Sequence, residues 1–138
     1  MMKIIPVLLI FLLLSFNFKT SASSSQVIKQ NRDVVVALHP NKGFGIQKKA
    51  PNTIRLIELK ESQAKLAEQI KSGKAIKILK NFKGETAKED NHYFSSIKAI
   101  RLKNVIQKNK KYAIDAKVFF CSFSEKYCSV QVIQQIIP

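Results

Sequence analysis

The sequence is poor in the side chains that most metal and cofactor sites need. It has no Trp, two Cys and two His among 138 residues. So few ligating side chains exclude a cluster held by several Cys and His residues. His39 and His92 are far apart in the sequence, and we interpret them as ordinary surface or turn residues, with a shared metal as the alternative. We expect neither a metal nor a cofactor.

Glycine is also scarce, and the motifs that depend on it are missing. None of the four Gly residues stands in a P-loop, a Rossmann pattern or a G-x-S-x-G elbow. These absences exclude the common nucleotide-binding folds and the usual serine hydrolases. They make an enzyme less expected than a binding protein, unless the cysteines carry the chemistry.

Acidic residues are few, with 9 Asp and Glu against 24 Lys and Arg and a formal charge of +15. Such a charge can attract anionic lipid, polysaccharide or an acidic partner, whereas solvated lysine faces are the alternative. The lysines that could form such patches are Lys42, Lys48, Lys49, Lys103, Lys108, Lys110 and Lys111. Aromatic residues are not interleaved with them in the way that stacks bases, so we do not expect nucleic acid as a partner.

The N-terminus has the three-part pattern of a secretory signal peptide. Lys3 precedes an apolar run at 4–16, and small residues follow at 20–23. The run of about 13 residues is short of the roughly 20 that span a bilayer, although a retained anchor is the alternative. We expect a signal peptide at 1–22, cleavage after Ala22, and export to the periplasm or the medium. Removing Lys3 and Lys19 lowers the formal charge from +15 to +13.

The rest of the chain predicts an all-β fold. We expect a flexible polar leader at 23–33 and one immunoglobulin-like β-sandwich domain at 34–138, with one short surface helix at 60–73. The predicted strands are 34–38, 53–59, 74–82, 93–102, 112–120 and 129–137. Continuation of the helix is the alternative for 74–82. Several short strands and a single weak helix favour a sandwich over a βαβ arrangement.

The clearest pattern is a C-terminal hairpin. Apolar residues occupy the even positions of 112–120, a period typical of a strand buried on one face. If Cys121 faces Cys128 across the hairpin, Phe119 faces Val130 and Lys117 faces Val132. Opposite β-carbons lie about 4.5–5.5 Å apart, which a small adjustment brings into the range of a disulfide. The sequence therefore predicts a hairpin closed by a Cys121–Cys128 disulfide.

Two roles for this cysteine pair remain open. If the pair is a structural disulfide, closing this short loop would stabilise an exported domain by roughly 2.5 kcal/mol. As a redox pair, an accessible bond at the mouth of a loop would exchange with other thiols, and Lys126 would favour the thiolate.

Several features together resemble a known exported module. They are Gly43-Phe44-Gly45-Ile46-Gln47, then Ala50-Pro51, a strand near 95–102, and the final hairpin with Cys121 and Cys128. The pattern is similar to the immunoglobulin-like domain at the N-terminus of the disulfide-interchange reductase DsbD. It also resembles the C-terminal domain of NHL-repeat thioredoxin-like proteins. In the reductase, the hairpin cysteines pass electrons from a transmembrane partner to periplasmic proteins, a role that the resemblance implies for Cys121 and Cys128. The six-residue loop differs from the reductase, because it holds no Gly and no Pro follows Cys128.

Our leading hypothesis is an exported, non-enzymatic β-sandwich module that binds another envelope protein through a loop or a sheet edge. The alternative is a thiol–disulfide exchange protein that uses Cys121 and Cys128. A third hypothesis is an electrostatic binder of anionic envelope surfaces.

Overall fold

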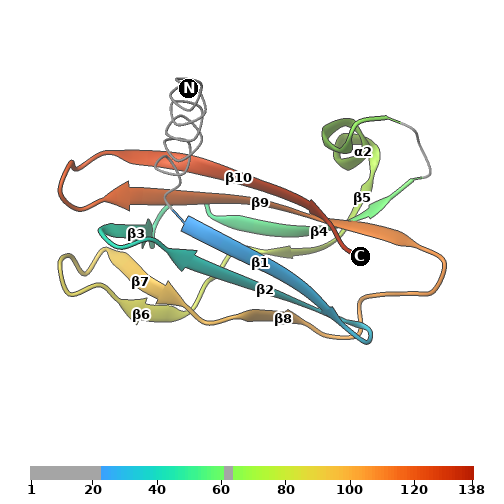
Figure 1. The fold of residues 1–138 in the computed structure, drawn as a ribbon, viewed down its shortest axis with the longest axis horizontal. Helices are drawn as coiled ribbons and strands as arrows, with labels where there is room; N and C mark the ends of the chain where they lie inside the picture. Colours follow the sequence, from blue (N-terminus) through green and yellow to red (C-terminus); the bar gives the residue numbers. More distant parts are fainter. Residues whose placement is uncertain (1–22, 61–63) are drawn as a thin grey trace, which may run out of the picture.

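The computed structural model describes residues 23–60 and 64–138, and the predicted signal peptide lies outside them. The described residues form two packed β-sheets (Figure 1). Their strands are β1 (Ser23–Gln30), β2 (Asp33–Pro40), β3 (Phe44–Gln47), β4 (Thr53–Leu59), β5 (Lys74–Leu79), β6 (Gly84–Thr86), β7 (Tyr93–Ile97), β8 (Ile100–Leu102), β9 (Lys111–Ser122) and β10 (Cys128–Ile136). The helix α2 spans Leu66–Ser72. None of the described helical structure has the length and hydropathy needed to cross a bilayer.

The twelve-residue strand β9 organises the larger sheet. The small sheet has the order β1-β2-β8, and the large one has the order β5-β4-β9-β3-β7-β6, with β10 also paired to β9. β4 pairs with the first part of β9 and β3 pairs with its end. Because a strand has two hydrogen-bonding sides, β4 and β3 share one side of β9, and β10 holds the other.

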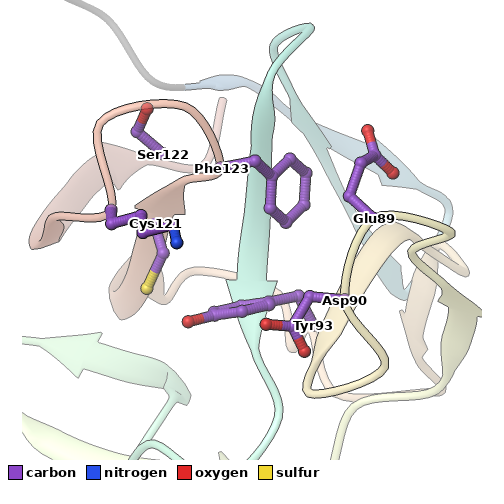
Figure 2. A pocket seen from close by; sticks show the side chains of 7 residues that line it. Glu89, Asp90, Tyr93, Cys121, Ser122 and Phe123 are labelled. Carbon is purple, nitrogen blue, oxygen red and sulfur yellow. The ribbon is translucent and has the colours of Figure 1, made fainter.

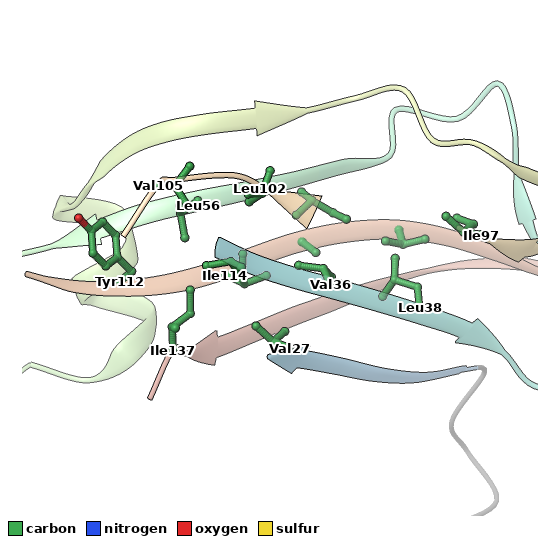
Figure 3. Packing of buried hydrophobic residues seen from close by; sticks show 14 of the residues in the cluster. Val27, Val36, Leu38, Leu56, Ile97, Leu102, Val105, Tyr112, Ile114 and Ile137 are labelled. Carbon is green, nitrogen blue, oxygen red and sulfur yellow. The ribbon is translucent and has the colours of Figure 1, made fainter. Parts of the chain in front are cut away.

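The core lies between the two sheets. Val34, Val36 and Leu38 alternate along β2 and are almost fully buried, as are Ile114 and Phe120 of β9. Figure 3 shows the labelled Val36 and Leu38 on the strand that crosses β9. Each such side chain contributes about 1.5–3 kcal/mol when removed from water. The predicted all-β sandwich with a disulfide-closed C-terminal hairpin is confirmed.

The flexible leader expected at 23–33 is wrong for most of its length, because Ser23–Gln30 forms β1. It pairs antiparallel with the whole of β2, from Ser23 opposite Pro40 to Gln30 opposite Asp33. Val27 is 7% exposed and joins the core, while most of the other side chains face solvent. Asn31 takes the left-handed conformation, with φ of 57°, and reverses the chain. A polar edge strand of this kind leaves no periodic apolar signal in the sequence.

The strand predicted at 74–82 exists as β5, but its side chains do not alternate strictly. A regular strand would place Ile76 and Ile78 on one face. Instead Ile76, Leu79 and Phe82 pack against the core, and Ile78 is 52% exposed. The register between β4 and β5 shifts next to Leu56, which indicates a β-bulge. One extra residue at a bulge reverses the alternation beyond it.

Short strands were the other elements that the sequence analysis missed. The segment predicted as one strand at 93–102 divides into β7 in the large sheet and β8 in the small one. β3 and β6 lie outside all of the predicted strands. Strands of three or four residues carry too little pattern to be recognised without their partners.

The buried side chain of Asn52 joins β3, β4 and β9. It is 3% exposed; its amide nitrogen donates to the carbonyl of Gln47 at 2.7 Å, and its amide oxygen accepts from the Phe119 N–H at 2.8 Å. Asn52 therefore lies beside β9 in the gap between the segment paired with β4 and the segment paired with β3. There its side chain satisfies the Gln47 carbonyl and the Phe119 N–H, two backbone groups that the strand pairing leaves without a partner.

We expect Asn52→Ala to lower the free energy of unfolding by about 1–3 kcal/mol, because two buried backbone groups lose their partner. Urea denaturation measures this change. Asn81→Ala, at an exposed position, is the matched control and should leave stability within about 0.5 kcal/mol of wild type. Equal effects of the two substitutions would contradict the role given to Asn52.

Asp33 ties the start of β2 to the connection after β8. Its carboxylate accepts from the Asn104 backbone N–H at 2.8 Å and from Arg101 Nη1 at 2.8 Å. The Asn104 N–H, and after it the Arg101 side chain, hold the pKa of Asp33 below its ordinary value of 3.8. A lowered folded-state pKa stabilises the fold above the unfolded-state pKa, and this stabilisation is lost as the pH falls through the folded value.

Asp33→Asn should therefore be less stable than wild type at neutral pH, and the difference should shrink as the pH falls below about 3.8. Thermal unfolding across pH 2–7 checks this trend. Glu85→Gln, at an exposed position, is the control for the loss of one carboxylate. A stability gap for Asp33→Asn that stayed constant down to pH 2 would show that its charge is not the cause.

Candidate functional site

Cys121 at the end of β9 and Cys128 at the start of β10 form the predicted disulfide, with a Cα–Cα distance of 4.0 Å. The next pair along the hairpin is hydrogen-bonded, because the Ser122 N–H donates to the Tyr127 carbonyl at 2.8 Å. The cysteines therefore occupy a non-hydrogen-bonded pair, where opposite Cα atoms come closest. The predicted register is confirmed, with Phe119 opposite Val130 and Lys117 opposite Val132.

The two sulfur-bearing residues differ in their access to solvent. Cys121 is 2% exposed, whereas Cys128 is exposed. The side-chain oxygen of Gln47 lies 4.0 Å from Cys121 Sγ. An incoming thiolate would therefore meet the Cys128 sulfur more readily, and Cys121 would have to leave as the thiolate.

A cleft of about 340 Å³ adjoins the disulfide (Figure 2). Its lining residues are Glu89, Asp90, Tyr93, Cys121, Ser122, Phe123 and Lys126. Tyr93 and Phe123 meet edge to face, with ring centroids 5.6 Å apart. Gly45 lies opposite Cys121 in the sheet, and a Cβ there would come within 2.7 Å of the Phe123 ring. The absence of a side chain at Gly45 therefore makes room for the aromatic pair.

The carboxylates of this cleft were missed by the sequence analysis. Glu89 and Asp90 come from the connection between β6 and β7, more than thirty residues before Cys121. Asp90 Oδ1 accepts from the His92 backbone N–H at 2.9 Å and lies 2.6 Å from its ring Nδ1. The backbone N–H and then the ring of His92 lower the pKa of Asp90. Asp90-Asn91-His92 indicates a local turn, but nothing in the sequence places that turn beside a cysteine.

The two histidines do not meet at a metal site. His39 lies on β2 opposite Ser24, and His92 lies in the turn before β7. Within residues 23–60 and 64–138, no group of three or more His, Cys, Asp and Glu residues has an arrangement suited to a metal ion.

The surroundings of the disulfide favour a structural bond. Exchange at Cys128 would leave a thiolate at the buried Cys121, and burial penalises the charged form. The oxygen of Gln47 and the carboxylates of the cleft offer that thiolate no compensation. Lys126 is the one cation among the described residues that line the cleft.

We expect the Cys121→Ser/Cys128→Ser variant to fold but to lose about 2.5 kcal/mol of stability, the closure entropy of a short loop. We also expect the wild-type bond to have a reduction potential below about −300 mV, the range of inert structural disulfides. Urea denaturation and equilibration in dithiol buffers measure these quantities. A potential near −200 mV together with unchanged stability of the double variant would instead indicate a redox pair.

The second candidate site is the outer edge of β10. The Ile137 N–H donates to the Tyr112 carbonyl at 2.9 Å. Because backbone groups in a strand alternate between its two sides, the odd-numbered residues of β10 direct theirs toward β9. The even-numbered residues direct theirs away from β9, and within the described chain β10 has no other strand partner. These residues are Cys128, Val130, Val132, Gln134 and Ile136. We call this row the β10 edge.

The side chains of the β10 edge are unusually apolar for an exposed strand. Val130, Val132 and Ile136 are 48%, 50% and 50% exposed. Residues 128–138 contain no charged side chain, although the chain carries 24 Lys and Arg. Gln134 donates to the buried Asp115 at 3.1 Å, which holds the middle of the strand onto β9.

Every other edge strand of the two described sheets carries a charge. β1 has Lys29, β5 has Lys74 and Lys77, β6 has Glu85, and β8 has Arg101. Charged side chains and short length are the usual means by which proteins keep sheet edges from pairing with other chains. The nine-residue β10 has neither protection.

No known protein family, curated protein or solved structure matches the chain in the comparisons.

Proposed function

We propose that this protein is an exported, non-catalytic β-sandwich module that binds another envelope or secreted protein by pairing an extended segment of that partner with the β10 edge. The signal-peptide pattern at 1–22 supports export, and so does the disulfide, since such bonds persist in oxidising compartments. The observation that carries the binding role is the unprotected, uncharged edge of β10.

Strand addition explains both features of this edge. A segment laid along β10 would satisfy the outward N–H and C=O groups of the even-numbered residues and supply the affinity. The exposed side chains of Val130, Val132 and Ile136 lie on the same face of that edge, and they would contact every second side chain of the added segment. The expected partner segment therefore alternates apolar residues.

Charge favours a different protein over a second copy of this chain. After loss of the signal peptide, each copy carries a formal charge of +13, and two copies side by side would repel one another. Lys117 lies opposite Val132 and forms no ion pair with any described residue. A partner segment with Asp or Glu near its apolar residues would pair with this lysine as well as with the edge.

Thiol–disulfide exchange is the second candidate, supported by the exposed Cys128 beside a cleft and by the resemblance to the DsbD domain. A partner thiolate would bond to Cys128 Sγ, the Cys121–Cys128 bond would break, and Cys121 would leave with the electron pair. The burial of Cys121 places this function second.

We expect Val132→Lys to abolish partner binding, because it introduces a charge at the centre of the β10 edge. Ile78→Lys is the matched control, since Ile78 is 52% exposed on the edge strand β5. The test is retention of proteins from an envelope extract of the producing cell on the immobilised mature domain. A protein retained by wild type and Ile78→Lys, but not by Val132→Lys, is the expected partner.

Hydrogen exchange of the purified complex then locates the contact. New protection should fall on the amides of Val130, Val132, Gln134 and Ile136 and not on their odd-numbered neighbours, which already bond to β9. Protection elsewhere, or equal binding by both variants, would refute the edge as the binding surface. A dimer in light scattering that Val132→Lys dissociates would replace the partner with a second copy.

A further inference from the structure

Another surface, distinct from the disulfide cleft, lies at the opposite end of the sandwich. There the turn between β1 and β2 meets the connection from β8 to β9, as Figure 1 shows. The two segments enclose a cleft of about 470 Å³, which we call the basic cleft. Its lining residues are Lys29, Asn31, Arg32, Ile106, Gln107, Lys108, Asn109 and Lys110.

Among the residues that the structure describes, the lining of the basic cleft includes four cations and no carboxylate. Lys110 pairs with Glu58 at 3.1 Å. Lys29, Arg32 and Lys108 form no ion pair with any residue of 23–60 or 64–138. Unneutralised cations in a concave site raise the local concentration of anions. The arrangement therefore favours a negatively charged ligand.

The backbone beneath these side chains is held by several hydrogen bonds. The Arg32 carbonyl accepts from the N–H groups of Val105 and Ile106, at 2.9 and 3.0 Å. The Gln107 N–H donates at 3.1 Å to the hydroxyl of Tyr112, which is 3% exposed. These bonds join the two segments that form the cleft, so the cations project from a fixed frame and a ligand need not order the backbone.

We propose that the basic cleft binds a phosphate-type anion. The guanidinium of Arg32 can donate two parallel hydrogen bonds to phosphate oxygens, and lysines supply compact positive charges. Asn31, Gln107 and Asn109 add amide donors and acceptors suited to the hydroxyl groups of a sugar or glycerol. The lining of the basic cleft contains no residue of the β10 edge, so anion binding there does not depend on the function proposed above.

A neighbouring cleft extends the site toward apolar residues. It encloses about 460 Å³, shares Lys29 and Lys110 with the basic cleft, and is also lined by Leu59, Ile136, Ile137 and Pro138. A phosphate that carries an apolar group would fit both clefts. The phosphate could thus belong to a lipid headgroup or to a soluble phosphorylated molecule.

Titration of the mature protein with inorganic phosphate, followed by amide chemical shifts at about 0.15 M salt, tests the anion site. We expect saturable shifts at residues 31, 32 and 106–110. The variant Lys29→Gln/Arg32→Gln/Lys108→Gln should bind at least about tenfold more weakly, because charge-assisted hydrogen bonds are lost. The control Lys77→Gln/Lys80→Gln/Lys83→Gln removes the same charge along and beyond β5 and should bind as wild type does.

Sedimentation with vesicles separates the two sources of phosphate. The ligand is a lipid headgroup if the wild-type protein binds phosphatidylglycerol vesicles but not phosphatidylcholine vesicles. This binding should be lost in the triple variant of Lys29, Arg32 and Lys108 and kept in the control triple variant. Saturable phosphate binding that is likewise specific to the cleft, without vesicle binding, assigns a soluble ligand. Shifts spread over all lysine faces, or equal losses in both triple variants, would overturn the proposal and leave only nonspecific attraction to charge.

Discussion

The pairing of β9 with β10 is the constraint on which the rest of the structure depends. β9 contacts β4 and β3 on one side and β10 on the other, and its even-numbered residues fill the core. A slip of one residue would turn Ile114, Val118 and Phe120 toward solvent. The disulfide prevents that slip, because its sulfurs meet in only one register. The apolar face of β9 and the bond between the cysteines thus specify the same arrangement.

That register also shapes the two surfaces that we propose for binding. Because the odd-numbered residues of β10 bond to β9, the even-numbered ones direct their backbone groups to an edge where no strand of residues 23–60 or 64–138 pairs with them. At the far end of β9, Tyr112 is buried and its hydroxyl accepts from Gln107, which helps to fix the segment that carries Lys108 and Lys110. One strand therefore supports the disulfide at one end and the basic cleft at the other.

The hairpin could be predicted from the sequence because its information is local. The alternation in 112–120 and the two cysteines specify the strands, the bond and the register without any other part of the chain. β1 could not be predicted because its mostly polar side chains carry no periodic apolar signal, although its partner β2 follows after a two-residue turn. β3 could not be predicted because it is a strand only through pairing with β7 and β9, which lie far away in the sequence. The two clefts were missed for the same reason as β3. Arg32 and Lys108 meet in one cleft, and Asp90 lies near Cys121, through tertiary contacts that no sequence spacing reveals.

The open edge of β10 requires an explanation beyond stability. An apolar strand of low charge with an unpaired side is prone to nonspecific pairing and aggregation. Lysine is abundant in this chain, and a single lysine at Val130 or Val132 would protect the edge at little cost, because both positions are about half exposed. Lysines stand on β1 and β5, where they provide that protection. The lack of charge on β10 is therefore more consistent with a surface that is covered by a partner than with one left in contact with solvent.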